Sequence, residues 1–188
     1  MPYGSYSRIA NSIIQLSTLH LEKQLTASKH AMKTRIYIET TIPSFYYTLR
    51  KDVESQAMMN WTRRWWSELA PEFTLVTSTA VIAELRRGTG ETVEQRLSLL
   101  ENAELLKVTR YIDDIANIYI EKRLMPNDPN GDALHLAIAS VYRVDVLLTW
   151  NCKHLANPSK MEHIRAVNYG LGLPMPLLTT PLNYLSGE

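Results

Sequence analysis

Cysteine is almost absent from this sequence, which has one cysteine, Cys152, among 188 residues. A single thiol excludes an internal disulfide framework and is typical of a reducing compartment, so we expect a cytoplasmic protein. No apolar run approaches the roughly 20 residues that a membrane-spanning helix needs, so no membrane association is expected. Polar residues between Asn11 and His20 interrupt what would be the apolar region of a signal peptide, so secretion is not expected either.

An excess of charge of one sign is also lacking. The 20 Lys and Arg residues nearly balance the 19 Asp and Glu residues, and the net charge is +1. This balance gives no general attraction for nucleic acid, although a local basic rim is compatible with it. The turn after the first apolar run contains no glycine, which argues against a phosphate-binding loop or a dinucleotide-binding fingerprint there.

The start of the chain differs from the rest. Residues 1–31 begin with small polar residues and continue into a stretch with an imperfect helical period and many Ser and Thr residues. We therefore predict a poorly structured or weakly helical N-terminal extension at 1–31 and a compact domain at 32–188. The length of the second segment is sufficient for one domain with a substantial core.

Within 32–188, short β-favouring apolar runs alternate with stretches of helical period. Strands are predicted at 35–38, 73–77, 105–108, 146–149 and, at the sheet edge, 174–179. Helices are predicted from near Pro43 and at 53–69, 79–87, 92–101, 112–124, 132–142 and 159–171, with a loop-like tail. The alternation predicts an α/β fold with a parallel central sheet and helices on both faces.

Polar residues are expected to gather at one edge of this sheet. Glu39 ends the apolar run Arg35–Ile38, and Glu84 lies in the second turn of the helix after the second strand. Asp132 opens a helix, and Asn151 follows the strand at 146–149. In parallel α/β sheets the carboxyl ends of strands and the amino ends of helices share the edge where ligands bind.

Three ionised carboxylates at one edge would repel each other unless a divalent cation neutralised them. Oxygen ligands and few histidines favour Mg²⁺ or Mn²⁺ over zinc. Each residue also has a simpler explanation. Asp132 is favourable at a helix N-terminus, Asn151 is a good cap for a short helix at 152–156, and Glu84 alone would be an ordinary solvated residue. Glu39 is the hardest to explain without a site, because it ends an apolar strand.

Four segments in this order and spacing resemble the PIN domain family, and in particular the VapC-type toxins of type II toxin–antitoxin systems. They are RIYIETTIPSFYY, TSTAVIAEL, GDALHLAIAS and VDVLLTWNCKHLAN. The resemblance implies a three-layer α/β/α sandwich and a metal-dependent endoribonuclease. It also implies that the acidic quartet of the family corresponds to Glu39, Glu84, Asp132 and Asn151, where Glu39 replaces the more general Asp and Asn151 replaces a common Asp.

The resemblance also suggests roles for these residues. Glu39, Asp132 and Glu84 would hold Mg²⁺ or Mn²⁺, and Asn151 would ligate or orient a water. Thr40 would support the site by donating a hydrogen bond to a metal-bound water or to phosphate. Basic residues that could contact RNA phosphate are Arg50, Arg86, Arg87 and Lys153, although solvated surface charge explains each equally well. His135 and His154, one turn on from Asp132 and Asn151, are interpreted as structural or rim residues.

Several functions and partners follow from this interpretation. The first is a ribonuclease toxin that acts on RNA and is silenced by a cognate antitoxin protein. The alternative is a catalytically weak PIN scaffold that binds nucleic acid or a protein partner, which Asn151 favours. A phosphoryl-transfer enzyme with an aspartyl nucleophile fits less well, because no second acid lies two residues after Glu39. A homodimer is also predicted. Its candidate surface is the cluster of Trp61, Trp65 and Trp66, for which core packing is the alternative interpretation.

Overall fold

A computed structural model describes residues 33–128 and 130–185. The N-terminal extension predicted at 1–31 lies outside the described residues. In the part of the chain that is described, no helix is both long and apolar enough to cross a membrane.

The centre of the fold is a five-stranded sheet in which every neighbouring pair of strands runs parallel. The strands are β1 (Arg35–Ile38), β2 (Thr74–Ser78), β3 (Glu104–Leu106), β4 (Val146–Leu148) and β5 (Leu177–Thr179). Their spatial order is β3-β2-β1-β4-β5, so β2 and β3 lie on one side of β1 and β4 and β5 lie on the other. The strand order therefore reverses between β1 and β4, which is where doubly wound sheets bind ligands at the carboxyl ends.

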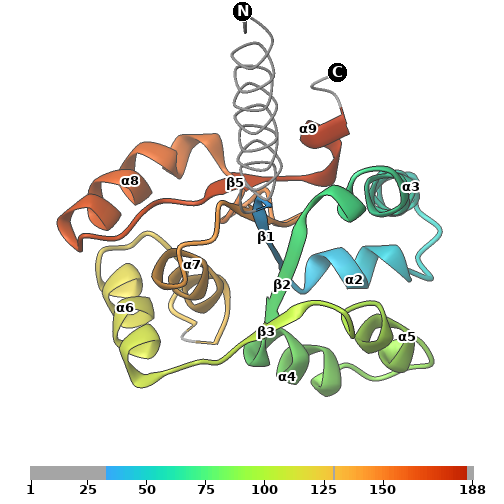
Figure 1. Cartoon of the computed structure of the whole chain (residues 1–188), viewed down its shortest axis with the longest axis horizontal. Coiled ribbons are helices and arrows are strands. Elements are labelled where there is room, and N and C mark those ends of the chain that lie inside the picture. The colour runs from blue at the N-terminus through green and yellow to red at the C-terminus, as the bar shows by residue number, and fades with distance from the viewer. Residues whose placement is uncertain (1–32, 129, 186–188) are drawn as a thin grey trace, which may run out of the picture. The chain divides into compact units, whose positions relative to one another are not determined.

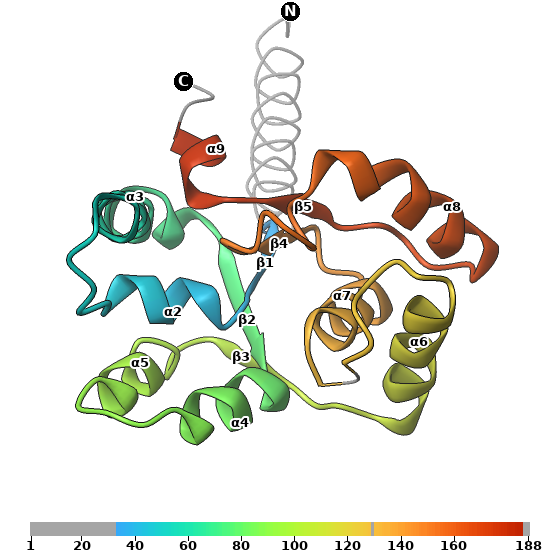
Figure 2. The same cartoon turned by 180° about the vertical axis from the view of Figure 1, so that it is seen from behind.

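Helices cover both faces of the sheet, so the predicted parallel three-layer α/β architecture is confirmed. On one side lie α6, α7 and α8, and on the other lie α2, α3 and α5, with α4 beyond the end of β2 (Figure 1, and from behind in Figure 2). The α-helices are α2 (Thr41–Tyr46), α3 (Val53–Glu68), α4 (Thr79–Arg87), α5 (Val93–Ser98), α6 (Arg110–Glu121), α7 (Asp132–Val141), α8 (Met161–Gly170) and α9 (Pro181–Leu185). Short 3₁₀ turns occupy Ala70–Glu72 and Pro158–Lys160.

The core lies where the sheet meets the two helix layers. Ile36, Tyr37 and Ile38 on the central strand β1 are completely buried, which explains why this run lacks polar alternation. Helix α7 is the most central helix, and every residue from Ala133 to Ser140 is buried. Its first residue, Asp132, is thereby held at a fixed place beside the end of the sheet.

Local sequence signals fix helix α4, which carries Glu84. The Ser78 hydroxyl at its N-cap accepts a hydrogen bond from the Val81 N–H, and Gly88 caps its end, as predicted. Val81 and Leu85 are buried against the core. The helix is therefore held from both its start and its apolar face, which limits where Glu84 can lie.

Several predicted boundaries are wrong. Helix α2 begins at Thr41, two residues before Pro43, and the proline is tolerated because the first four N–H groups of a helix need no partner within it. Residues 152–156 form turns and not a short helix. The predicted loop-like tail instead contains α9, which packs against α3 and buries Leu185. These contacts are tertiary, and the local pattern gave little sign of them.

The prediction that Trp65 lies at a dimer surface is also wrong. Trp65 is fully buried and stacks on Phe73 with a ring-centroid distance of 6.2 Å. Trp61 and Trp66 are partly buried and pack against the same core. The three tryptophans therefore anchor α3 to the hydrophobic core, which is the alternative interpretation of this cluster. The homodimer itself remains a prediction.

Candidate metal-binding active site

Glu39 occupies the position directly after the central strand β1, at the reversal point of the strand order. Its carboxylate is buried, and the Oε2 atom accepts three hydrogen bonds. The donors are the Thr41 N–H at 3.0 Å, the Thr41 hydroxyl at 2.5 Å and the Thr149 hydroxyl at 2.8 Å. Among the described residues no donor reaches Oε1, so one oxygen of Glu39 is fixed and the other is left to bind a ligand.

Glu84 is held in the same way from two neighbouring elements. Its Oε2 atom accepts hydrogen bonds from the Thr40 hydroxyl at 2.6 Å and from the His135 ring at 3.2 Å. Burial alone would raise the pKa of this carboxyl, but the hydrogen bonds from His135 and Thr40 and the charges of His135 and Arg87 lower it. Glu84 is thus kept as a carboxylate, and its Oε1 atom has no donor from the described part of the chain.

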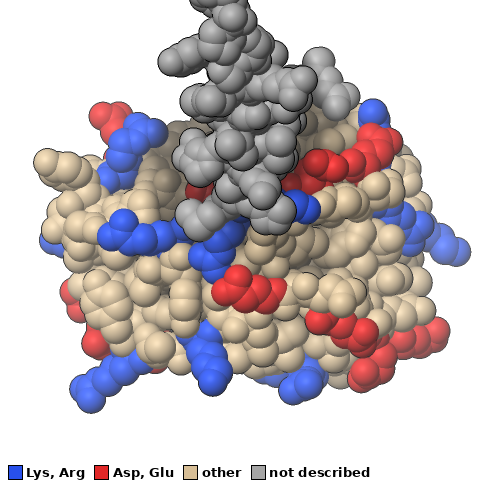
Figure 3. Space-filling view, in the orientation of Figure 1, with Lys and Arg blue, Asp and Glu red and all other residues tan. Residues whose placement is uncertain are grey.

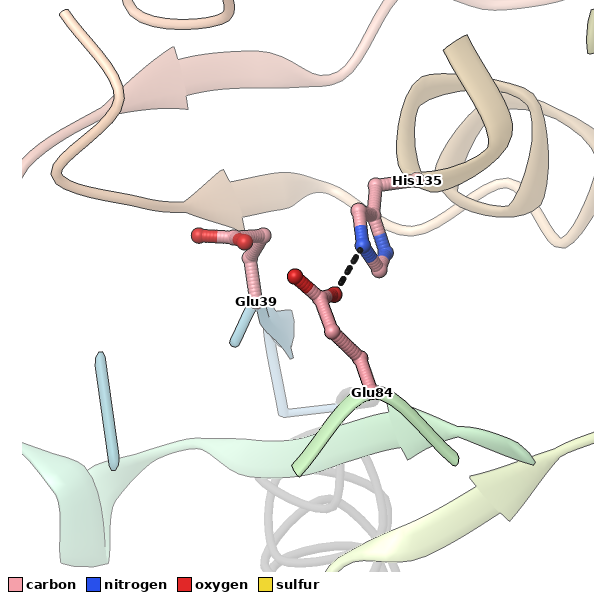
Figure 4. Close-up of side chains that lie close together, drawn as sticks. All are labelled: Glu39, Glu84 and His135. Atoms are coloured by element: carbon pink, nitrogen blue, oxygen red, sulfur yellow. Dashed lines mark hydrogen bonds and ion pairs between the residues drawn. The ribbon is translucent and has the colours of Figure 1, made fainter. Parts of the chain in front are cut away.

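Three side chains from three different elements converge at this point. Figure 4 shows Glu84, from α4, lying between Glu39, from the end of β1, and His135, from α7. Each offers one ligand atom, and these three atoms lie within 4.8 Å of one another. Two ionised carboxylates this close together repel each other unless positive charge lies between them. Together with the imidazole they therefore form a candidate cation site.

His135 is a member of a buried chain of hydrogen bonds. Its Nε2 atom faces Glu84, and its Nδ1 atom lies 2.9 Å from the Tyr37 hydroxyl. The Tyr37 hydroxyl lies 2.7 Å from the Ser78 hydroxyl, which in turn accepts from the Val81 N–H. Every polar side-chain atom in this series of hydrogen bonds therefore has a partner. The series links Glu84 to the frame formed by β1, β2 and α4.

The hydrogen-bond pattern allows His135 to be neutral or protonated. If it is neutral, Nε2–H donates to Glu84 and the Tyr37 hydroxyl donates to Nδ1. If it is protonated, both ring nitrogens donate and the Tyr37 hydroxyl turns to Ser78. Burial would lower the pKa of His135, but the hydrogen bond to Glu84 and the charges of Glu39, Glu84 and Asp132 raise it. Burial raises the pKa of Tyr37 far above its usual value, so Tyr37 keeps its proton.

The sequence interpretation of His135 as a structural or rim residue missed its place at the centre of the cluster. His135 is one helical turn after Asp132, on the same face of α7. The signal that could have found it is this i,i+3 spacing on a helix whose first residue is a site candidate. His154, interpreted in the same way, contributes its backbone N–H, which donates to the Asn151 side-chain oxygen at 3.1 Å.

Asp132 and Asn151 form a second part of the site. The Asn151 amide nitrogen donates to Asp132 Oδ1 at 2.7 Å, while its oxygen accepts from His154 N–H. Burial raises the pKa of Asp132, and this effect outweighs the charges of His154 and His135 and the hydrogen bond from Asn151, which lower it. Both polar atoms of the Asn151 side chain are thus engaged, so it holds Asp132 in place. Asp132 Oδ2 has no donor among the residues described.

The three carboxylates thus share one pattern. In each, one oxygen is fixed by a donor of the protein, and the other has no donor among the described residues. Such a set of held carboxylate oxygens fits a hard divalent cation that retains some of its water. Both ring nitrogens of His135 are already engaged, Nε2 with Glu84 and Nδ1 with the Tyr37 hydroxyl, so His135 fits better as a partner of a ligand than as a ligand itself.

The other candidate residues lie around this centre. The Thr40 hydroxyl donates to Glu84, whereas the expected donation was to a metal-bound water or to phosphate. Arg86 and Arg87 are exposed in the last turn of α4, and Arg50 and Lys153 are exposed in loops. On the face seen in Figure 3, Lys and Arg side chains alternate with Asp and Glu in small groups. A contact of these basic residues with RNA stays a prediction.

Comparison with known proteins gives similarities of fold. No family model and no curated protein matches the sequence. VapC20 of Mycobacterium tuberculosis, a sarcin–ricin-loop-cleaving toxin, is 16% identical over 65% of this chain and 95% of its own, with a TM-score of 0.49. VapBC2 of Rickettsia felis, bound to a promoter DNA fragment, is 18% identical over 78% of this chain and 98% of its own, also at 0.49.

A third similar structure is VapBC-1 of nontypeable Haemophilus influenzae, which is 19% identical over 69% of this chain and 94% of its own, with a TM-score of 0.49. These values describe likeness of fold and leave the activity of this chain as a separate question. The solved structures that this chain is similar to include VapC20 and two VapBC proteins.

Proposed function

We propose that this chain is an endoribonuclease that depends on Mg²⁺ or Mn²⁺. The observation that carries the proposal is the convergence of Glu39, Glu84 and His135, whose ligand atoms lie within 4.8 Å of one another at the reversal point of a parallel sheet. Nearby Asp132 adds a third carboxylate with one fixed oxygen. The resemblance of the motifs to VapC-type toxins supports RNA as the substrate.

The residues of the chain have distinct tasks in this proposal. Glu39, Glu84 and Asp132 would hold the cation with the carboxylate oxygens that no donor among the described residues reaches. When bound, the cation polarises a phosphate oxygen and lowers the pKa of a water. Thr40, Thr41 and Thr149 fix the orientation of the glutamates, and Asn151 fixes that of Asp132. Positioning of this kind decides the rate because the ligands need no rearrangement during the reaction.

The same motif resemblance supports a biological role as the toxin of a toxin–antitoxin pair. A cognate antitoxin protein would then cover the site and silence it. A cytoplasmic location and a homodimer belong to the same proposal.

A catalytically weak scaffold is the second candidate, and one observation favours it. The fourth position of the quartet, Asn151, uses its amide nitrogen on Asp132 and its oxygen on His154, so it adds no free oxygen and no charge to the site. A site with one charge fewer is expected to bind a cation more weakly, above all a second one. Cation affinity separates the two candidates.

The test is cleavage of a mixed pool of single-stranded RNA by the purified full chain, with Mn²⁺ and with EDTA. Glu39→Gln and Asp132→Asn replace the charge with little change of shape, and Asp114→Asn, an exposed acid on α6, is the matched control. We expect cleavage with Mn²⁺ by the wild type and the control only. Folded protein that neither cleaves RNA nor binds Mn²⁺ would favour the scaffold.

A further inference from the structure

A pocket that carries two arginines lies on the other side of Thr41 from Glu39. It has a volume of about 380 Å³ and opens between α2, the loop after it and α5. Its lining consists of three hydroxyl side chains, one aromatic ring and two arginines, namely Thr41, Ser44, Thr48, Phe45, Arg50 and Arg96. Cations and hydroxyl groups line the pocket without any carboxylate, so its chemistry suits an anion.

Arg96 is the residue that most needs a ligand there. Its Nε atom is buried, and among the described residues it has no hydrogen-bond partner. Partial burial also lowers the pKa of its guanidinium. No acceptor among the described residues holds this donor, so the Arg96 side chain can adjust to present its guanidinium to an anion that enters the pocket.

The pocket is joined to the metal site through one side chain. Thr41 lines the pocket, and its hydroxyl and N–H both donate to Glu39 Oε2. The same hydroxyl accepts from the Trp150 N–H at 2.8 Å, so its position is set by β1 and by the chain after β4. A group bound in the pocket is therefore separated by one residue, Thr41, from the carboxylate that is proposed to hold the cation.

We infer that this pocket binds a backbone phosphate of the RNA strand beside the one that is cleaved, with Arg96 and Arg50 as its cationic ligands. The inference rests on the proposed function, because the strand must pass from the pocket to Glu39. Two guanidinium groups match phosphate oxygens in geometry, and the neighbouring hydroxyls add donors. Phosphate contacts of this kind position a strand without reading its bases.

The test measures binding of a short fluorescein-labelled single-stranded RNA of mixed sequence to the full chain in EDTA, so that no cleavage occurs. Arg96→Gln and Arg50→Gln remove one charge each, and Arg110→Gln, at the exposed start of α6 across the sheet, is the control with the same change of charge. We expect each pocket variant to bind about tenfold more weakly. The salt dependence of binding, as log K against log salt, should become shallower by about 0.7.

Additional variants separate a ligand contact from a structural role. If both arginines hold one phosphate, the double variant should lose less than the sum of the two single variants. Arg96→Lys keeps the charge without the planar donor set and should recover part of the affinity. Thermal unfolding checks that the variants remain folded, since only a folded variant with weaker binding supports the inference.

The outcomes distinguish this inference from the proposed function. Arg96-dependent RNA binding in EDTA without any cleavage in Mn²⁺ would support the pocket and remove the nuclease. Metal-dependent cleavage with RNA affinity and salt dependence unchanged in Arg96→Gln would remove the pocket and leave the nuclease. Binding of an acidic peptide that depends on Arg96, with RNA binding unaffected, would overturn the inference in favour of a protein partner.

Discussion

The buried Tyr37 hydroxyl gives the sharpest prediction for the site. Tyr37→Phe removes one oxygen atom from a completely buried ring and changes little else. The lost hydroxyl bridges the Ser78 hydroxyl at 2.7 Å and His135 Nδ1 at 2.9 Å. Ser78 keeps its bond from the Val81 N–H, whereas His135 Nδ1 is left without a partner in a buried position.

The magnitude follows from these contacts. Leaving one buried polar atom unpaired costs about 1–3 kcal/mol of the free energy of unfolding. For a domain of this size, about 2 kcal/mol corresponds to a fall of about 4–8 °C in Tm. A ring that has lost its Nδ1 partner is also held less firmly, so Glu84 should be positioned less well and Mn²⁺ affinity should fall severalfold.

Tyr119→Phe is the matched control. Tyr119 is also completely buried, and its hydroxyl donates to the Asn168 side-chain oxygen at 2.6 Å, on the side of the fold formed by α6 and α8. Urea unfolding should give a similar loss of stability in both variants. Titration with Mn²⁺, followed by calorimetry, should show weaker binding only in Tyr37→Phe.

Two results would refute this reasoning at different steps. Unchanged stability of Tyr37→Phe would mean that the hydroxyl makes no net contribution to the buried chain. If the two variants lost equal stability and bound Mn²⁺ equally well, the hydrogen bonds that link Ser78, Tyr37 and His135 would have no part in positioning Glu84.

Three further predictions concern side-chain hydrogen bonds. Thr62→Val should lower stability by about 1–3 kcal/mol in urea unfolding, because the buried Trp150 Nε1–H loses its acceptor at 2.7 Å, while Thr62→Ser should retain most of it. Asn168→Ala should cost about 3 kcal/mol or more, because its buried amide makes three hydrogen bonds, and a loss below 1 kcal/mol would contradict this. Asn151→Asp places a second carboxylate against Asp132 at the 2.7 Å contact, so without a cation it should lower Tm. Added Mn²⁺ should reverse that loss and bind severalfold more tightly than in the wild type, and a Tm insensitive to Mn²⁺ would count against the metal site.

The strand that carries Glu39 shows how much the sequence can determine. A β-favouring apolar run that ends in an acid predicts a buried strand with a carboxylate at its end, and the structure has both. The same holds for helix α4, whose cap at Ser78 and stop at Gly88 are local signals. Features governed by neighbours in the sequence are therefore predictable, because caps, breakers and side-chain period act within a few residues.

Features that depend on contacts between distant segments were missed. Helix α9 forms because Leu185 is buried and α3 lies against it, and no signal within those five residues required it. The helical spacing of Trp65 is compatible with either an interface or the core. Only its packing against Phe73 shows that it belongs to the core.

The candidate site divides in the same way. The sequence by itself placed Glu39, Glu84, Asp132 and Asn151 at one edge of a parallel sheet, because strand ends and helix starts meet there in any such fold. Only the tertiary structure decided which atoms meet: His135 beside Glu84, Asn151 turned to Asp132, and one oxygen of each carboxylate fixed by a donor. The physical reason is that a hydrogen bond depends on atomic positions to within a fraction of an ångström. Those positions are set by packing between segments far apart in the sequence, and Tyr37 and His135, for example, are 98 residues apart.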